Sequence, residues 1–221
     1  MEFDLGPVVD RIPLLLEGLG LTLGLTALAF VAGGLLGLPL ALSRMLPNRW
    51  LRLPVTMLVE STLSTPVPLH LFLVFFGVTA VFGIFISPFH SILLVLVWNQ
   101  AVVMSENYRS GLQSVPKGIR AAVSVLGLST IDRYRYVILP LAIRAILPPT
   151  TSSTVNLIKD SALAGFIGAN DLLNAGRLGA TESFRPIEFY TVVAIMYFVI
   201  SYPIVWFSDR AEHKMSRSRA A

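Results

Sequence analysis

Five polar side chains lie inside stretches of the sequence that are otherwise apolar: Glu60, Asn99, Gln100, Lys159 and Asp160. An ionisable side chain in hydrocarbon costs about 2.5–3.5 kcal/mol on insertion scales, so it normally faces a protein interior or a water-filled path. Carboxylate, ammonium and amide groups hold a polar solute through ion pairs and hydrogen bonds. These residues therefore point to solute binding within a membrane, or to helices locked together by polar pairs.

Two further residues extend this set. Thr65 ends a run of hydroxyl residues just before Pro66, and a proline frees a backbone carbonyl and disturbs the helix around it. Broken helices near the bilayer centre commonly build binding sites in transporters. Asn156 lies one turn before Lys159, so the two side chains share a helix face. The candidate substrate-path residues are therefore Thr65, Asn99, Gln100, Asn156, Lys159 and Asp160.

Each of these polar groups also has a structural interpretation. We expect Glu60 to pair with a basic loop residue near the cytoplasmic end of its helix. Glu106, three residues before Arg109, is expected to be a structural ion pair or a helix-end residue rather than a ligand for substrate. The two adjacent amides hydrogen-bond either a substrate or a neighbouring helix, because buried amides need partners. The adjacent lysine and aspartate either line a path or only lock helices together, and both alternatives remain open.

Catalytic and metal-site chemistry find no support in the residue pattern. His70, His90 and His213 are far apart, and none has a partner at the spacing of a metal site. The sequence has no cysteine and no GxxxxGKS/T phosphate loop. We therefore expect no catalytic residue, no metal and no cofactor in this chain. If ATP drives this protein, another chain must bind it.

The composition indicates an integral membrane protein with one domain over residues 1–221. Of the 221 residues 54% are hydrophobic and 14% are charged, and the mean hydropathy is +0.72. A soluble domain of this length would carry roughly 25% charged residues. The net charge of +4 is not a nucleic-acid signal, because its location matters more than its sum. The acidic N-terminus lacks a basic region, so we do not expect a signal peptide.

Five stretches are long and apolar enough to span a membrane, which takes about 20 residues of helix. The predicted spans are 18–43, 53–77, 88–108, 138–168 and 187–208. Prolines are expected to break the second span, and Pro148-Pro149 the fourth. Two GxxxG pairs in the first span, one at Gly20 and Gly24 and one at Gly33 and Gly37, predict close helix packing.

The basic residues predict the orientation. Most of the 17 Lys and Arg residues lie after the first span, after the third span and in the C-terminal tail. Such loops stay on the cytoplasmic side, because Lys and Arg resist translocation. The chain is therefore expected to be an all-α multi-pass protein with its N-terminus outside and its C-terminus in the cytoplasm. Residues 169–186, between the fourth and fifth spans, are then expected to form a polar external loop.

The loop between the third and fourth spans is a polar island that runs from Glu106 to Arg144. Its Ser114-Val115-Pro116 sequence predicts a helix start, with a hydroxyl that can cap and a proline in the first turn. The following residues form a short amphipathic helix that Gly127 can end. A second helix start is expected at Ser129. The island thus presents a short cytoplasmic helix to a partner in the cytosol.

The residues SVPKGIRAAVSVLGLS, followed after a spacer by VILPLAIRAILPP, resemble the cytoplasmic loop signature of ABC importer permeases. The resemblance is closest to the polar amino acid uptake branch and extends from about Leu19 to about Val205. The family's Glu-Ala-Ala falls on Ala121-Ala122-Val123, its glycine on Gly127 and its Leu-Pro on Leu139-Pro140. Ala121 stands where the family has glutamate.

The resemblance implies a fold of five transmembrane helices with a short cytoplasmic coupling helix between the third and fourth. It implies a permease subunit in the bacterial plasma (inner) membrane, with a substrate path where two permease subunits meet. Its partners would be two ABC ATPase subunits that bind ATP and Mg, a second permease subunit and an external solute-binding protein. The residues implied in ATPase coupling are Lys117, Gly118, Arg120, Ala121, Ala122, Val123 and Gly127.

Departures from the family pattern favour an unlike second permease subunit. Leu63 stands at a family arginine, Ala121 at the loop glutamate and Ala162 at a hydroxyl. A homodimer would lose each feature twice, whereas a heterodimer keeps one copy in its partner. The alternatives are an ion-coupled secondary transporter, against which the lack of a visible repeat argues, and a membrane scaffold that recruits a cytosolic partner.

Overall fold

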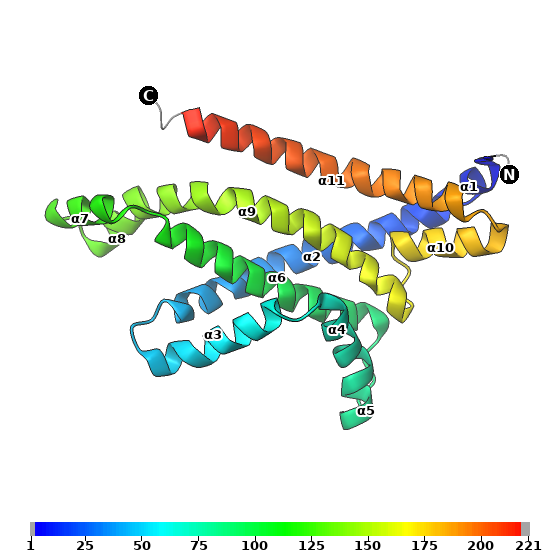
Figure 1. Ribbon diagram of the computed structural model, residues 1–221, viewed down its shortest axis with the longest axis horizontal. Helices are drawn as coiled ribbons and strands as arrows, with labels where there is room; N and C mark the ends of the chain where they lie inside the picture. The colour runs from blue at the N-terminus through cyan, green and yellow to red at the C-terminus, as the bar shows by residue number, and fades with distance from the viewer. Residues whose placement is uncertain (1–2, 218–221) are drawn as a thin grey trace.

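The computed structural model describes residues 3–217, with side chains for all of them except 209 and 211–217. Helices make up nearly all of this part of the chain, and no strand occurs in it (Figure 1). The α-helices are α1 (Gly6–Asp10), α2 (Ile12–Arg44), α3 (Arg49–Leu63), α4 (Val67–Phe72), α5 (Val78–Phe82), α6 (Pro88–Gln113), α7 (Lys117–Val125), α8 (Thr130–Arg133), α9 (Leu139–Asp160), α10 (Leu172–Ser183) and α11 (Pro186–Arg217). Three other helical segments join them: the π-helical turns η1 (Leu73–Gly77) and η2 (Tyr134–Ile138), and the 3-10 helix η3 (Ser161–Ile167).

The long helices form a bundle with alternating directions. In Figure 1, α2, α6 and α11 run from right to left, and α9 runs from left to right. α2 packs along α6, α6 along α9, and α9 along α11. α3 diverges from this bundle, α4 packs against α6, and α5 projects away from it (Figure 1). The short helix α7 lies at the left end, and α10 with the N-terminus lies at the right end.

Close approach of α2 and α6 depends on glycine. A Cβ added at Gly33 would lie 2.7 Å from the Cβ of Gln100, and one at Gly37 would lie 2.8 Å from the carbonyl oxygen of Ala101. This second GxxxG pair therefore packs as predicted. The first pair does not pack within the described chain, because a Cβ at Gly20 or Gly24 would meet nothing within 4 Å.

Three apolar clusters hold the bundle together. The largest joins α2, α6 and η3 through fully buried residues such as Leu25, Ile92 and Leu96. A second, at the α10 end, gathers around Leu172 and Phe189. A third, smaller cluster lies where α6 meets η2 and α9, close to the base of α7. The clusters thus fix both ends of the bundle and its middle.

Three helices are long and apolar enough to cross a membrane: α2, α6 and α11 over Pro186–Ser208. They contain the first, third and fifth predicted spans, and α2 begins at Ile12, earlier than predicted. The second predicted span is broken, as its prolines indicate, because α3 and the segment Val67–Phe82 meet at a bend of 104°. By length and composition the described chain has three such helices, or four crossings if the bent pair is one span.

The fourth predicted span differs most from expectation. α9 is one continuous helix of 22 residues, and Pro148 and Pro149 lie inside it without ending it. The predicted interruption there is therefore wrong. α9 is not among the described helices that are apolar enough over 18 residues to be a membrane span by composition alone. Its ionisable side chains, from Arg144 to Asp160, and its run of hydroxyl residues lower its hydropathy.

Candidate functional site

The short helix in the polar island is present as α7, but its start differs from prediction. Pro116 is the residue before the first turn, and no side chain caps that end. Ser114 instead donates a hydrogen bond from its Oγ to the carbonyl oxygen of Gly111 at 2.8 Å and ends α6. Beyond α7, Gly127 has the left-handed φ of 68° that was expected of it. Ser129 caps α8, where it accepts a hydrogen bond from the backbone of Asp132.

The seven predicted coupling residues divide between two faces. Lys117, Gly118, Ala121, Ala122 and Gly127 are exposed, whereas Val123 is buried and Arg120 is half-buried. The Arg120 guanidinium donates to the carbonyl oxygens of Leu112 and of Val115, the latter at 3.3 Å. Leu112 is in the last turn of α6, where a cation is favourable because the carbonyls there carry the negative end of the helix dipole. Arg120 thus ties α7 to α6.

Apolar side chains follow the exposed face of α7 toward α8. Val125 is 88% exposed, Leu126 72% and Ile131 76%. They lie at the end of the bundle where the basic residues of the polar island gather. This surface combines exposed apolar residues with Lys117, which suits a protein partner better than free solvent.

An ionic cluster joins the ends of three helices beside this loop. Arg44, the last residue of α2, pairs with Glu60 of α3 and with Glu106 of α6, each at 2.7 Å. Glu106 also binds Arg109, with a distance of 3.2 Å from Oε2 to Nε. The structural interpretation of both glutamates is therefore confirmed. Arg44 itself, which belongs to the basic stretch after the first predicted span, is only 4% exposed in its side chain.

The predicted path residues at the break after α3 and on α6 do not share one environment. The Oγ1 of Thr65 donates to the carbonyl oxygen of Ser61 at 2.7 Å. Asn99 donates from Nδ2 to Val95 at 3.0 Å and lies 3.3 Å from the Nδ1 of His70. Gln100 is buried against α2, and its Nε2 has no hydrogen-bond partner in the described chain. Asn99 therefore faces the bent pair of helices, and Gln100 faces the α2 interface.

The path residues of α9 lie along its groove with α11. One cavity of about 390 Å³ is lined by Asn156 together with Pro148, Thr151, Ser152 and Ser208. A second cavity of about 260 Å³ includes Lys159, Tyr197, Ser201 and Tyr202, and both include Val155 and Val205. Lys159 makes no ion pair or hydrogen bond with any described residue. Asp160, its neighbour, does not line either cavity, so the predicted set of six does not come together in one place.

The polar external loop predicted at 169–186 contains α10. Asp171 begins this helix, and its carboxylate accepts from the backbone of Leu173 at 3.2 Å and of Asn174 at 3.1 Å. Asp171 is fully buried, and burial raises the pKa of its carboxyl group from 3.8 to about 6. An aspartate directly before a helical stretch is a start signal that the sequence offered and that the loop interpretation missed.

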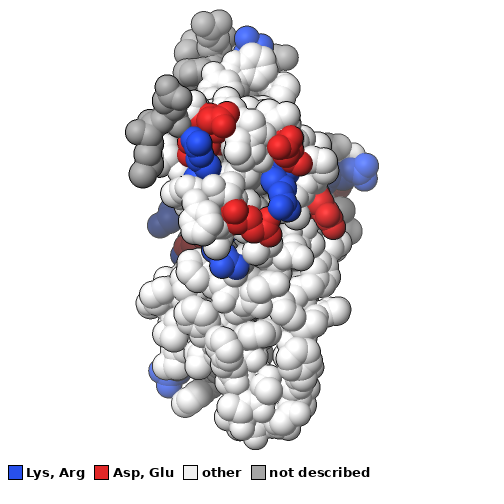
Figure 2. Space-filling model, turned by 90° about the vertical axis from the view of Figure 1, so that its right-hand side faces the viewer, with Lys and Arg blue, Asp and Glu red and all other residues white. Residues whose placement is uncertain are grey.

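The right-hand end of the molecule carries charges of both signs. Figure 2 shows acidic and basic side chains interleaved there rather than a patch of one sign. Two of its ion pairs are Arg11–Glu182 at 2.5 Å and Arg185–Glu188 at 3.1 Å. This end differs from the α7 end, where the polar island is almost entirely basic.

Within the part of the chain that the structure describes, no three His, Asp or Glu side chains are grouped to hold a metal ion. His70 lies beside Asn99, and His90 lies 2.7 Å from the Oγ of Ser87. His213 falls outside the described side chains. The described polar groups named above make ion pairs and contacts between helices.

Long apolar helices, an ion-paired bundle and a small exposed basic helix together define a multi-pass membrane protein of the permease class. Residues 12–217 match the family described as binding-protein-dependent transport system inner membrane component. The chain belongs to this family.

Curated relatives match over almost the whole chain. The glutamine transport system permease protein GlnP of Escherichia coli is 31% identical over 97% of this chain and 99% of its own. The L-cystine transport system permease protein TcyL of Bacillus subtilis is 28% identical over 98% and 93%. The histidine/lysine/arginine/ornithine transport system permease protein HisM of Escherichia coli is 30% identical over 89% and 87%.

Solved structures agree with this assignment. A chain in the crystal structure of an amino acid ABC transporter with histidines superposes with a TM-score of 0.90 at 31% identity, covering 97% of this chain and 100% of that one. The MetNI methionine ABC transporter in an inward-facing conformation gives a TM-score of 0.77 at 22% identity, with coverage of 93% and 97%. The second likeness concerns the fold alone.

Proposed function

We propose that the chain is the permease subunit of an ATP-driven importer of amino acids or similar small polar solutes. The observation that carries this proposal is the likeness, at a TM-score of 0.90 and along nearly the full chain, to a permease of an amino acid transporter. The curated relatives named above, which transport glutamine, cystine and basic amino acids, support the same solute class.

We infer five crossings, with the N-terminus outside and the C-terminus in the cytoplasm. α6 and α11 run in the same direction in Figure 1, so the chain must return across the bilayer between them. α9 runs the opposite way and packs against both, which makes it the fourth crossing. The bent pair of α3 and α4 returns the chain between α2 and α6 in the same manner. The basic polar island then lies on the cytoplasmic side.

ATP binding and hydrolysis would take place on two separate ATPase subunits that carry ATP and Mg. α7 would dock on them through its exposed residues Lys117, Gly118, Ala121 and Ala122. Arg120 would pass the movement of α7 to the end of α6, because its guanidinium holds the α6 carbonyls. The apolar Val125 and Leu126 would lose their exposure in that contact.

A second permease subunit would complete the substrate path. The face of α9 that carries Ser152, Asn156 and Lys159 is exposed in the single chain. Lipid would be a costly neighbour for this face, since a lysine in hydrocarbon costs about 2.5–3.5 kcal/mol. A partner permease that covers a water-filled groove here removes that cost. The absent loop glutamate at Ala121 favours an unlike partner that retains it.

The experiment is uptake into proteoliposomes that contain the complex captured through a tag on this chain after expression with its genomic neighbours. We expect ATP-dependent uptake of a radiolabelled amino acid, and only when the external solute-binding protein is present. Uptake driven by an ion gradient without ATP would instead indicate a secondary transporter. Capture of an ATPase without uptake of any amino acid would indicate a scaffold.

A further inference from the structure

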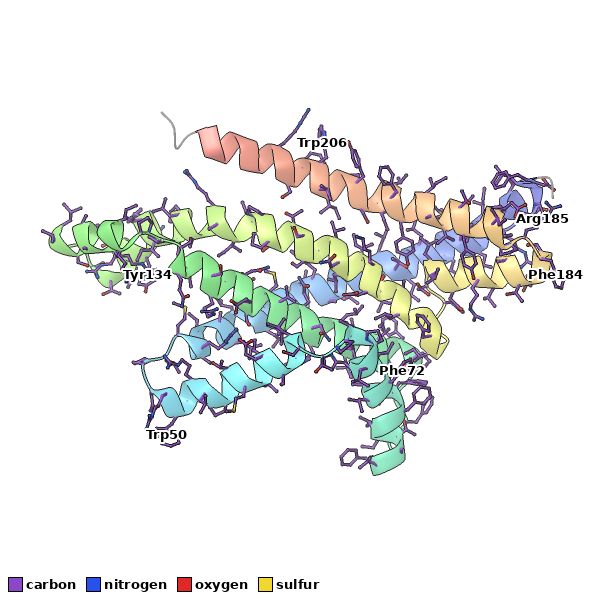
Figure 3. The ribbon with its side chains drawn as sticks, viewed as in Figure 1. Trp50, Phe72, Tyr134, Phe184, Arg185 and Trp206 are labelled. Carbon is purple, nitrogen blue, oxygen red and sulfur yellow. The ribbon has the colours of Figure 1, made fainter. Side chains whose placement is uncertain are left out.

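α3 is the long helix with the fewest attachments to the bundle. Only Val59 and Thr62 are buried among its residues. The Nε1 of Trp98 on α6 donates to the Oγ1 of Thr62 at 3.2 Å, and Glu60 holds Arg44. At the other end of α3, Trp50 is 72% exposed and lies away from the bundle (Figure 3). Three side chains of α3 near its C-terminal end, Val59, Glu60 and Thr62, therefore hold it against the bundle.

The ion pair between Arg44 and Glu60 has one fixed and one exposed member. The Arg44 side chain is 4% exposed, whereas the Glu60 side chain is 59% exposed. If Glu60 moves away, Arg44 keeps a counter-charge, because Glu106 remains bound to it and is itself held by Arg109. The pair can therefore open on the α3 side without leaving a buried charge alone.

Opening of this pair would move the helix break. Ser64, the C-cap residue of α3, lies about one turn after Glu60. The 104° bend at Thr65 and Pro66 follows directly. α4, beyond the bend, brings His70 to Asn99 on α6. A shift of α3 against α2 and α6 would therefore change the position of Thr65 and the contact between His70 and Asn99.

The same cluster is linked to the cytoplasmic loop. α7 holds the last turn of α6 through Arg120, and α6 holds Arg44 through Glu106. A movement of α7 can thus reach Arg44 along a single helix, α6. The physical requirement for such coupling is an element with two arrangements that both sites bias, and a closed and an opened Arg44–Glu60 pair would be those two arrangements.

We propose that the Arg44–Glu60 ion pair is a latch that positions α3 against α2 and α6 and that opens and closes during each transport cycle. Arg44 and Glu60 are positioning residues in this mechanism, and they act on the path through the bend at Thr65. This inference rests on the proposed function of the chain as an importer permease. A fixed ion pair that only stabilises the bundle is the competing arrangement.

The first test compares Glu60→Gln with Glu60→Asp in the purified, reconstituted complex. The readout is the amount of solute imported per ATP hydrolysed, which a merely structural role would not change. We expect Glu60→Gln to lower this ratio at least fivefold at an unchanged amount of assembled complex, and Glu60→Asp to restore most of it. The matched control is Glu182→Gln, which removes the Arg11 ion pair of similar exposure at the other end of the molecule and should leave the ratio unchanged.

The second test uses the absence of cysteine from the chain. The double variant Arg44→Cys with Glu60→Cys, paired with cysteine-free partners, is joined by a cleavable bifunctional thiol reagent that spans the former ion pair. We expect the bridge to stop uptake and reductive cleavage to bring back the level of the untreated double variant. The single variant Glu60→Cys, treated in the same way, controls for the reagent.

Two results would overturn the latch. One is an unchanged ratio of solute to ATP in Glu60→Gln, and the other is full uptake by the bridged double variant. If the double variant fails to assemble, the ratio in the two Glu60 variants decides alone. The unmodified complex separates the two proposals. If it shows no ATP-driven uptake, the proposed function fails. If it takes up solute normally and Glu60→Gln has the same ratio of solute to ATP, only the latch is overturned.

Discussion

The guanidinium of Arg120 on α7 donates a hydrogen bond to the backbone carbonyl of Leu112 in the last turn of α6. We expect Arg120→Ala to release α7 and to speed amide hydrogen exchange across residues 117–125. The loss in stability should be about 1 kcal/mol, at the low end for a charge-assisted hydrogen bond because Arg120 is half exposed. Hydrogen-exchange mass spectrometry of the purified chain measures both effects.

Lys117→Ala is the matched control for this variant, since Lys117 is an exposed cation on the same helix. It should leave hydrogen exchange in α7 unchanged and weaken only the capture of the ATPase. Equal exchange rates in Arg120→Ala and the unmodified chain would contradict the tie between α7 and α6.

Local patterns predicted the helices of the polar island well, and tertiary contacts decided the rest. Gly127 and Ser129 have the conformations that their types favour at helix ends. Ser114 does not cap α7, because α6 continues to Gln113 and the Ser114 hydroxyl donates to the carbonyl oxygen of Gly111 in that helix. Nothing in the local sequence distinguishes these two uses of a serine before a proline, since both satisfy a backbone group.

Gly37 and Gly24 lie on the same helix but should respond oppositely to alanine. A Cβ at Gly37 would lie 2.8 Å from the carbonyl oxygen of Ala101, so Gly37→Ala should destabilise the chain by about 1–3 kcal/mol. Gly24→Ala meets nothing within 4 Å and should stabilise helix α2 by about 0.5–1 kcal/mol. Thermal unfolding of the separate chain in detergent measures both, and a loss of similar size in the two variants would contradict the packing of α2 on α6.

Asp171 should make the stability of the chain depend on pH. Its pKa is about 6 in the folded chain, above its ordinary value of 3.8, because the carboxyl group is buried. Between these values the folded chain holds a proton that the unfolded chain releases, so stability should fall as pH rises from about 4 to 6. The loss is complete above pH 6 and amounts to at most about 3 kcal/mol.

Asp171→Asn should remove this part of the pH dependence. Asparagine also caps helices, so the hydrogen bonds from Leu173 and Asn174 can persist. Thermal unfolding midpoints of both chains between pH 4 and pH 7.5 give the comparison. The two curves should converge at pH 4 and separate toward pH 7, with the variant more stable, and parallel curves would rule out Asp171 as the source.

The charged side chains show where reasoning from sequence stops. The pairings of Glu60 and Glu106 were predictable from charge and position, because carboxylates inside apolar stretches need cations. The burial of Arg44 was not, since it arises where three helices meet, and these contacts are separated by 16 and 62 positions in the sequence. Asn99 and Gln100 are likewise both polar and adjacent in sequence. They point in different directions around α6, so Asn99 meets His70 and Gln100 meets Gly33 of α2.

Substitution of Lys159 tests whether the groove between α9 and α11 is a solute path or only a contact between helices. It faces Tyr197 and Tyr202 across a cavity of about 260 Å³ and has no ion pair within the described chain. We expect Lys159→Met to leave the assembly and the thermal stability of the complex unchanged or improved, because an unpaired cation is removed from an apolar region. Uptake should fall at least tenfold, because the groove loses its charge, while Lys159→Arg, which keeps the charge, should retain more uptake. If assembly and uptake fall together in Lys159→Met, the ammonium instead pairs with a partner chain, and the solute path must lie elsewhere.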